Sequence, residues 1–218
     1  NKVTYIKGKG VLFSKNDIVV YDNNKKTSYK TKNIVIATGS EVTSLPGIEI
    51  DEKNIISSTG ALSLDKVPKK LAVIGGGYIG LEMGSVWSRL GSEVTVIEYL
   101  DFITPGMDRE ISNEFKKILT KQGIKFNMGS KVVSVKNNGA KVLINYKDIK
   151  NSEDKTLEVD KVLVSVGRKP YTDGLNLAKV GVKKDNKGRI EVNEKLQTSV
   201  QNIYAIGDVI KGPMLAHK

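Results

Sequence analysis

The sequence contains no cysteine, which excludes disulfide bonds, thiolate metal sites and thiol chemistry from within its 218 residues. Long apolar runs are also missing, and none approaches the roughly 20 residues that would span a bilayer. The chain has no apolar stretch of the signal-peptide type at its start and does not begin with Met. We therefore expect it to be an internal piece of a longer protein that has no membrane span here.

Arginine and histidine are scarce, so the formal net charge of +11 comes almost entirely from lysine. A nucleic-acid-binding protein is expected to gather basic residues together with aromatic ones. The lysines are instead scattered through turns and amphipathic segments, as in Lys25-Lys26, Lys69-Lys70, Lys116-Lys117 and Lys183-Lys184. We interpret them as a solvated surface and expect neither nucleic acid nor a membrane as a partner.

Short β-branched runs alternate with two amphipathic segments. The strands that we expect lie at residues 3–6, 10–13, 18–21, 27–30, 33–37, 71–74, 93–98, 124–126, 132–135, 141–146, 156–159, 161–166, 190–192 and 202–206. The run at 33–37 suggests a strand buried on both faces. Helices are expected at 81–90 and 108–122. One face of the second helix carries Ile111, Phe115, Ile118 and Leu119.

Residues 75–80 read Gly-Gly-Gly-Tyr-Ile-Gly, directly between a predicted strand and a predicted helix. This order is that of a dinucleotide-binding turn. Gly75 permits the tight turn, Gly77 lets a pyrophosphate approach the backbone, and Gly80 lets the helix pack closely on the sheet. The helix N-terminus adds unpaired N–H groups. The chain is therefore predicted to be an α/β protein with a Rossmann-like dinucleotide-binding domain, a parallel sheet and an antiparallel β-meander.

Glu98 ends the strand that follows this helix. A carboxylate at that point can accept hydrogen bonds from the hydroxyls of an adenosine ribose, and it would repel a 2′-phosphate. The next residues, 99–102, offer no cation to a phosphate, so the sequence predicts NAD rather than NADP. Glu82 leaves two interpretations open, since its side chain is either solvated or directed into the site.

Two further predicted strands end in glycine, at Thr38-Gly39 and at Gly207-Asp208. Open α/β sheets bind ligands at this end of their strands. Asp208 has the chemistry to accept a hydrogen bond from a sugar or polyol hydroxyl. Each segment alone is equally compatible with an ordinary junction between a strand and a turn.

The order of these motifs resembles that of the flavoprotein disulfide reductases. The segments that carry the resemblance are 37–41 (Ala-Thr-Gly-Ser-Glu), 75–82, 166–170 (Val-Gly-Arg-Lys-Pro) and 203–208 (Ile-Tyr-Ala-Ile-Gly-Asp). Within this family, residues 57–62, 81–87 and 212–218 are similar to the dihydrolipoamide dehydrogenases. The resemblance covers essentially the whole chain.

The resemblance implies that residues 61–182 form an NAD-binding domain that interrupts an FAD-binding domain. Residues 1–60 and 183–218 are then partial FAD-domain segments. The family's redox-active cysteine pair, N-terminal FAD fingerprint and catalytic His–Glu pair are absent from this sequence. We therefore expect a central piece without a catalytic residue or a metal site of its own.

The resemblance also implies which residues bind the cofactors. The NAD contacts are expected at Gly75, Gly76, Gly77, Tyr78, Ile79, Gly80, Glu82, Glu98, Val132 and Gly167. The FAD contacts are expected at Gly10, Thr38, Gly39, Ser40, Asp208, Met214, Leu215, Ala216 and His217. In this scheme Ile79 and Glu82 approach the nicotinamide, and Asp208 binds the ribityl or pyrophosphate part of FAD. His217, the one histidine, matches a flavin-lining position and not the catalytic base.

The implied activity is oxidation of dihydrolipoamide through a redox disulfide and FAD, with hydride transfer to NAD⁺. The implied partner is the lipoyl domain of a 2-oxoacid dehydrogenase complex, and the implied assembly is a homodimer in a bacterial cytoplasm or a mitochondrial matrix. This piece alone is expected to bind NAD(H) weakly, to retain no FAD and to be inactive. One alternative is another flavin disulfide reductase, such as a mercuric, peroxide or coenzyme A disulfide reductase. The other alternative is a non-enzymatic NAD(H)-sensing module.

Overall fold

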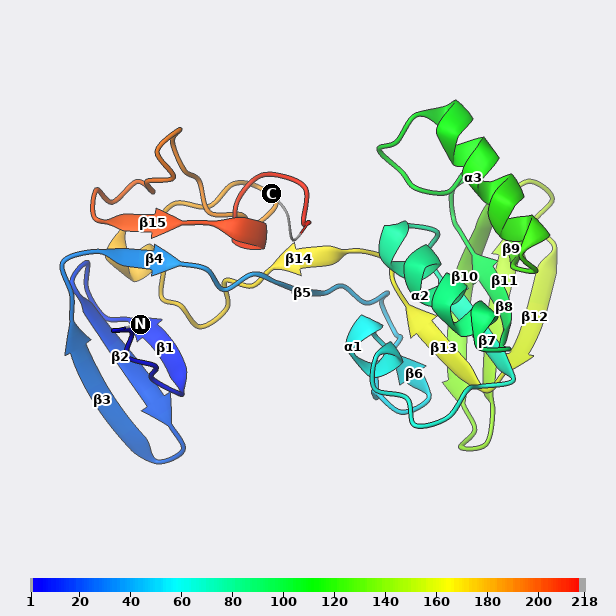
Figure 1. Ribbon diagram of the computed structural model, residues 1–218, viewed down its shortest axis with the longest axis horizontal. Helices are drawn as coiled ribbons and strands as arrows, with labels where there is room; N and C mark the ends of the chain where they lie inside the picture. The colour runs from blue at the N-terminus through cyan, green and yellow to red at the C-terminus, as the bar shows by residue number, and fades with distance from the viewer. Residues whose placement is uncertain (1, 216–218) are drawn as a thin grey trace. The chain divides into compact units, whose positions relative to one another are not determined.

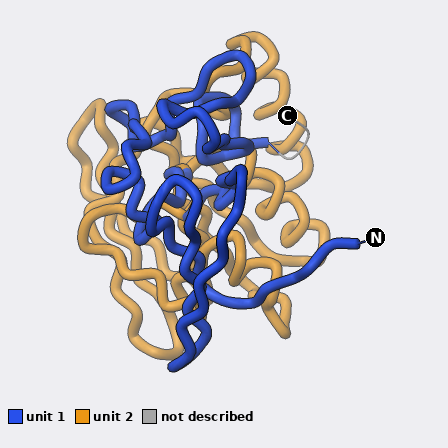
Figure 2. The backbone as a smooth tube through the Cα atoms, turned by 90° about the vertical axis from the view of Figure 1, so that its left-hand side faces the viewer, with its two compact units in different colours: residues 1–41, 168–218 blue, residues 42–167 orange. Residues whose placement is uncertain are grey.

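The computed structural model describes residues 2–215, and the chain divides into two compact units (Figure 2). One unit comprises residues 1–41 and 168–218, and the other comprises residues 42–167. These boundaries differ from the expected domain boundaries at 60/61 and 182/183. Residues 42–60 belong with the second unit because Ile48, Ile55 and Ile56 are buried in its cores. Packing does not identify a cofactor, so the FAD and NAD domain assignments stay predictions.

The unit of residues 42–167 is built on a five-stranded parallel sheet with the order β6-β13-β7-β8-β9 (Figure 1). These strands are β6 (Ile55–Ile56), β7 (Lys70–Ile74), β8 (Glu93–Ile97), β9 (Lys125–Asn127) and β13 (Lys161–Val164). The helices are α1 (Ser58–Ala61), α2 (Tyr78–Arg89) and α3 (Arg109–Lys121). An antiparallel meander follows, formed by β10 (Ser130–Asn137), β11 (Val142–Asp148) and β12 (Asp154–Val159). The predicted parallel sheet with an antiparallel meander is confirmed.

The side chains of β7 point alternately into the two hydrophobic cores of this unit, one on each face of the sheet. Leu71 and Val73 face the core that contains Leu81 and Trp87 of α2. Ala72 and Ile74 face the opposite core, which the meander covers. Because successive side chains of a strand point to opposite faces, one apolar run builds both cores. The parallel sheet therefore lies between a helical layer and the meander.

The buried face of α3 differs from the face that we expected. Ile111 and Ile118 are exposed, whereas Leu119 is buried and Phe115 packs against the core. The remaining buried position of the helix is Ser112, at 1% exposure. The periodicity was misassigned because Ser112, a polar residue, lies in the stripe i, i+3, i+7 that faces the sheet.

The other unit contains a three-stranded antiparallel sheet and a parallel pair of strands. The sheet consists of β1 (Lys9–Leu12), β2 (Asp17–Asp22) and β3 (Lys25–Lys30), and the pair consists of β4 (Ile34–Ile36) and β15 (Ile203–Ala205). The shorter elements are β5 (Ser40–Val42), β14 (Arg168–Pro170) and the 3₁₀ turns η1 (Ala178–Val180) and η2 (Gly207–Val209). The core includes Ile34, Ile36, Ile190 and Ile203.

Three expectations for this unit were wrong. Residues 3–6 form no strand, and the strand expected at 190–192 is reduced to isolated bridges at Ile190. Val35 of β4 is exposed, so this strand buries one face and not both. A run of β-branched residues is compatible with a strand buried on one face as well as with a strand buried on both, so the sequence of β4 does not decide between the two. No helix within residues 2–215 is long and apolar enough to cross a membrane.

Helix α2 approaches β7 most closely at Gly80. A Cβ added there would lie 2.9 Å from Val73 Cγ1 and would also meet the Gly75 carbonyl oxygen and Ser165 Oγ. We expect Gly80→Ala to lower the free energy of unfolding by about 1–3 kcal/mol, because this well-packed contact cannot accept another methyl group. Urea denaturation measures the change.

Gly84 on the same helix is the matched control. A Cβ at that position would make ordinary contacts, at 3.4 Å from Val94 and 3.5 Å from Val73. Because alanine has the higher helix propensity by about 1 kcal/mol, Gly84→Ala should be neutral or stabilising. Equal losses in both variants would contradict the assignment of the close approach to Gly80.

Asp160, the residue before β13, is hydrogen-bonded to β7 and to the residue that precedes β11. Its Oδ2 accepts from the Lys70 backbone N–H at 2.8 Å, and its Oδ1 accepts from Lys141 Nζ at 2.5 Å. Burial raises the pKa of Asp160, but the hydrogen bonds from Lys141 and the Lys70 backbone outweigh it, so the pKa lies below its ordinary value of 3.8. The ionised carboxylate therefore stabilises the fold above about pH 4, and this stabilisation is lost as the pH falls through the lower folded-state pKa.

We expect Asp160→Asn to lower the stability at pH 7 and to reduce the further loss of stability between about pH 5 and pH 2. Denaturation midpoints measured across this range would test both effects. If the variant loses as much stability as the starting protein between about pH 5 and pH 2, the Asp160 carboxylate makes no pH-dependent contribution.

Candidate nucleotide-binding site

The glycine turn begins at Gly75, which directly follows β7 and has a φ of +106°. A Cβ at this position would lie 2.5 Å from the carbonyl oxygen of Ser165, and the Gly75 N–H donates to Ile97 of β8 at 3.0 Å. Both the positive φ and the close neighbour require glycine. The turn is therefore fixed against the carboxyl ends of β8 and of the segment after β13.

Gly77 is the N-cap of α2, and its surroundings contrast with those of Gly75 and Gly80. An added Cβ would meet no heavy atom within 4 Å, and no side chain caps the helix. The first turn of a helix leaves backbone N–H groups without partners inside the helix. The turn therefore combines open space with backbone donors, which suits a phosphate group.

Glu98 lies just after β8 and is 8% exposed. Its Oε2 accepts from the Gly76 N–H at 2.5 Å, and its Oε1 accepts from the Leu100 N–H at 2.7 Å. Each carboxylate oxygen has a second lone pair, so the group can still accept hydroxyl donors. Glu98 thus supports the glycine turn as well as standing beside it, which the sequence reasoning did not anticipate.

The remaining predicted NAD residues border the same unit's sheet. Tyr78 and Glu82 of α2 are exposed, and no described residue forms a hydrogen bond or an ion pair with the Glu82 carboxylate. The exposure of Glu82 fits a solvated side chain and also one directed into an open site, so both interpretations stay predictions. Ile79 is partly buried, and Gly167 has a φ of +126° with no heavy atom within 4 Å of an added Cβ.

Val132 lies on β10, which starts beside Glu98 through a 2.8 Å bond from the Ser130 N–H to the Glu98 carbonyl. Its cross-strand partner is Tyr146 on β11. Burial raises the pKa of the Tyr146 phenol, and the positive charge of Lys155 offsets only part of this increase. The carboxyl ends of β7, β8 and β13 and the start of β10 therefore bring Gly75, Glu98 and Val132 to one edge of the unit.

A polar cluster in the other unit joins Ser40, Arg168 and Asp208. Arg168 Nε donates to Ser40 Oγ at 2.6 Å and its Nη2 donates to the Ser40 carbonyl at 2.7 Å. Ser40 Oγ donates in turn to Asp208 Oδ2 at 2.6 Å. Among the described residues, none donates a hydrogen bond to Asp208 Oδ1, so this carboxylate oxygen remains able to accept from a ligand. Arg168 was missed as a site residue, although it follows the predicted Gly167 directly.

The other predicted FAD residues are more dispersed. Thr38 Oγ1 donates to the Tyr171 carbonyl at 2.6 Å, and Gly39 has a φ of +71°. Gly10 lies on β1 opposite Val20, and no hydrogen bond joins it to the Ser40–Arg168–Asp208 cluster. Met214 is partly buried and Leu215 is exposed. Ala216 and His217 lie outside the described residues.

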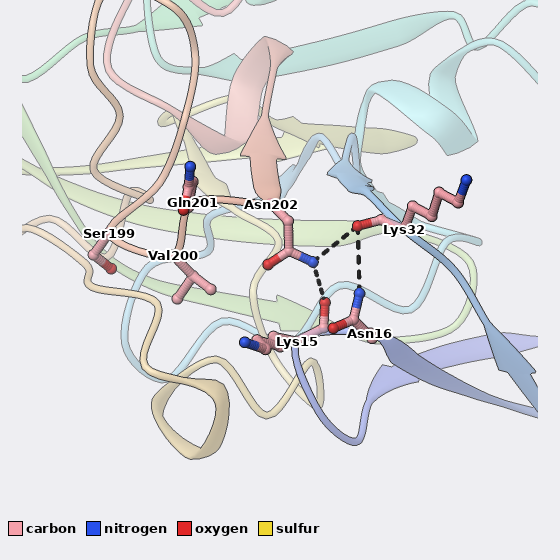
Figure 3. Close-up of a pocket in the computed structure, with 7 residues that line it drawn as sticks. All are labelled: Lys15, Asn16, Lys32, Ser199, Val200, Gln201 and Asn202. Atoms are coloured by element: carbon pink, nitrogen blue, oxygen red, sulfur yellow. Dashed lines mark hydrogen bonds between the residues drawn. The ribbon is translucent and has the colours of Figure 1, made fainter.

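A surface pocket of about 480 Å³ in this unit shares no residue with the predicted sites (Figure 3). Its lining residues are Lys15, Asn16, Lys32, Ser199, Val200, Gln201 and Asn202. Asn202 Nδ2 donates to the carbonyls of Lys15 at 2.6 Å and Lys32 at 3.1 Å, which ties three loops together. Its hydrogen bonds serve this loop packing.

Within residues 2–215, no group of three or more acidic or histidine side chains could hold a metal ion.

A buried parallel strand, a glycine turn, a helix and a buried acid after the next strand define a dinucleotide-binding fold. Residues 1–218 match the family described as pyridine nucleotide-disulphide oxidoreductase, so the chain belongs to that family. Membership in this family implies FAD and NAD as cofactors. The identification made from the sequence motifs is confirmed at this level.

Relatives and solved structures agree with this membership. Leghemoglobin reductase of Glycine max and the mitochondrial dihydrolipoyl dehydrogenase of Pisum sativum are each 56% identical over 219 residues. Both alignments cover the whole chain, but only 42% and 44% of those relatives. The structure of LpdA from Mycobacterium tuberculosis matches with a TM-score of 0.87 at 26% identity, over 97% of this chain and 47% of that one.

The HOCl-induced flavoprotein disulfide reductase RclA of Escherichia coli matches with a TM-score of 0.86 at 29% identity. The alignment covers 97% of this chain and 47% of RclA. The chain therefore spans less than half the length of the relatives that it matches.

Glu98→Gln tests the support that this side chain gives to the glycine turn. The amide retains one acceptor oxygen but turns its NH₂ group toward either the Gly76 or the Leu100 N–H. We expect a loss of about 1–3 kcal/mol in the free energy of unfolding without any nucleotide, as for a buried donor left unpaired. Urea denaturation measures it.

Glu82→Gln is the control, since it removes a carboxylate from the same site at an exposed position. Glu82→Gln should change the free energy of unfolding by no more than about 0.5 kcal/mol. A Glu98→Gln variant as stable as the starting protein would show that its two backbone hydrogen bonds contribute nothing to the turn.

Proposed function

We propose that residues 42–167 bind NAD(H) in preference to NADP(H). The observation that carries the proposal is the open face of Gly77 beside the buried carboxylate of Glu98. In this proposal the pyrophosphate lies against the N-terminus of α2, and Glu98 accepts hydrogen bonds from the adenosine ribose. A 2′-phosphate would instead meet this carboxylate, and electrostatic repulsion disfavours it.

The proposed NAD contacts follow the edge that the glycine turn defines. They are Gly75, Gly76, Gly77, Tyr78, Ile79, Gly80, Glu82, Glu98, Val132 and Gly167. Glu82 is exposed and has no protein partner among the described side chains, so it is available to a nicotinamide. Ile79, partly buried in the first turn of α2, would orient the ring by contact.

The other unit contributes, in this proposal, part of a site for FAD. Asp208 would accept from the flavin's ribityl hydroxyls, and the Ser40–Arg168–Asp208 cluster supports the proposal because it leaves one Asp208 oxygen for a ligand. Thr38 and Gly39 would lie along the same ligand, with Gly10 and residues 214–217 as further contacts. The bound cofactors supply hydride transfer between flavin and nicotinamide, while the chain's residues bind and orient them.

For the longer protein we propose the activity of a dihydrolipoamide dehydrogenase, with lipoyl domains as partner and a homodimer as assembly. Dihydrolipoyl dehydrogenases of Pisum sativum and Arabidopsis thaliana, each 56% identical, support this activity, and leghemoglobin reductase of Glycine max at the same identity represents the alternative of another reductase. The mitochondrial names of these relatives favour a mitochondrial matrix over a bacterial cytoplasm. An NAD(H)-sensing module remains the non-enzymatic alternative, and retention of nucleotide binding without any flavin binding in the longer protein would favour it.

Calorimetric titration of the 218-residue chain with NADH and NADPH tests the nucleotide proposal. We expect NADH to bind and NADPH to bind at least tenfold more weakly, because an unpaired charge near Glu98 costs more than about 1.4 kcal/mol. Equal binding of the two nucleotides, or no binding to a chain shown to be folded by circular dichroism, would overturn it.

A second arm tests the expected inactivity of the isolated chain. With no cysteine to receive electrons from a dithiol, the chain should produce no NADH from dihydrolipoamide, with or without added FAD. The mitochondrial dihydrolipoyl dehydrogenase of Pisum sativum provides the positive control. NADH production by the 218 residues alone would show that the proposed route of electrons is wrong.

A further inference from the structure

The loop between β8 and α3 contains an unusual backbone conformation. Thr104 has a φ of +51°, in the left-handed region, although its side chain is β-branched. It is the one β-branched residue in that region among the described residues, and it is 4% exposed. Such conformations are unfavourable for threonine, and they persist where surrounding contacts hold them, often at ligand sites.

Three hydrogen bonds hold Thr104 in place, and one of them runs from the Met107 N–H to the Thr104 carbonyl at 3.1 Å. Its Oγ1 lies 2.8 Å from Ser112 Oγ, and both hydroxyls are buried. Its backbone N–H donates to the carbonyl of Gly76 at 2.8 Å. Ser112 is anchored in the first turn of α3, where its N–H donates to the Asp108 carbonyl at 2.9 Å. The hydroxyl pair therefore connects α3 to the glycine turn through one residue.

The bond to Gly76 fixes the direction of the next N–H group. In a trans peptide the carbonyl of one residue and the N–H of the following residue point in opposite directions. Because the Gly76 carbonyl points to Thr104, the Gly77 N–H points away from that loop. No described residue accepts a hydrogen bond from this N–H, and Gly77 faces open space. On the other side, Glu98 holds the Gly76 N–H.

We propose that Thr104 and Ser112 are positioning residues for a pyrophosphate group, an inference that rests on the proposed nucleotide function. They hold the Gly76–Gly77 peptide so that the Gly77 N–H is already directed at the phosphate before the ligand arrives. The ligand class is a molecule with a diphosphate joined to adenosine, such as NAD(H) or ADP-ribose. Neither residue touches the ligand, since both act through the Gly76 carbonyl.

Ser112→Ala and Thr104→Gly test this arrangement in the 218-residue chain. Ser112→Ala removes one hydroxyl of the pair. Thr104→Gly removes the other hydroxyl while accepting the positive φ, so it keeps the test open if Ser112→Ala does not fold. We expect each variant to bind ADP-ribose roughly tenfold more weakly, as for one charge-assisted hydrogen bond that is no longer prearranged. Calorimetry measures ADP-ribose, and ligand-observed NMR measures adenosine.

Adenosine separates positioning from general damage, because it lacks the diphosphate. Its affinity should be unchanged in both variants, and Thr104→Ser should restore ADP-ribose binding because it keeps the hydroxyl. The double variant should bind no more weakly than either single variant, since both remove the same pair. Thr120→Ala, which removes an exposed hydroxyl from the same helix, is the matched control and should change neither ligand.

The outcomes distinguish this inference from the function on which it rests. If the starting protein is folded and binds neither NADH nor ADP-ribose, the proposed function fails and the positioning role fails with it. If the starting protein binds ADP-ribose and both variants bind it equally well, only the positioning role is overturned. Equal losses for adenosine and ADP-ribose would also overturn it, because they indicate general damage to the site.

Discussion

The contact between Gly80 and β7 determines the geometry on which the candidate site depends. With no side chain at Gly80, α2 lies against Val73 and its first turn stands at the carboxyl end of the strand. The same end of the sheet carries Glu98 and the segment that begins at Ser165. A methyl group at Gly80 would have to move the helix, and with it the N–H groups that the first turn presents. Close packing and ligand recognition are thus two consequences of one missing side chain.

Glu98 also connects the structure of the glycine turn with the nucleotide binding that we propose. Its carboxylate holds backbone N–H groups of Gly76 and Leu100 while it remains beside the ribose position that we propose. Because the turn is already hydrogen-bonded, little conformational entropy remains to be lost when a nucleotide binds. The same engagement means that removal of the carboxylate changes both the turn and the ribose contact. Binding data on Glu98 variants therefore need the corresponding unfolding data to be interpreted.

The sequence predicted the parts of the fold that depend on strong local patterns. The buried strand at 71–74, the glycine turn and Glu98 were found because glycine spacing, β-branched runs and an acid each carry an independent signal. It did not predict the buried stripe of α3, since Ser112 is polar and its partner Thr104 lies in an irregular loop. The Ser40–Arg168–Asp208 cluster was also only partly foreseen, because residues far apart in sequence are joined there by side-chain hydrogen bonds. Such tertiary contacts leave no periodic signal.

Because the sequence contains no cysteine, the proposed function assigns cofactor binding to these residues and the oxidation of the dithiol to other parts of the enzyme. Oxidation of a dithiol by a flavin disulfide reductase requires a disulfide that accepts the electrons, and these 218 residues cannot form one. What they do contain is a glycine turn, a buried acid and a carboxylate held by Ser40, groups that suit the binding of a nucleotide and are not themselves oxidised. In the proposed enzyme this region would then set the position and the identity of the hydride acceptor. Preference for NAD would thus be determined here, whereas the choice of disulfide substrate would be determined by residues outside this sequence.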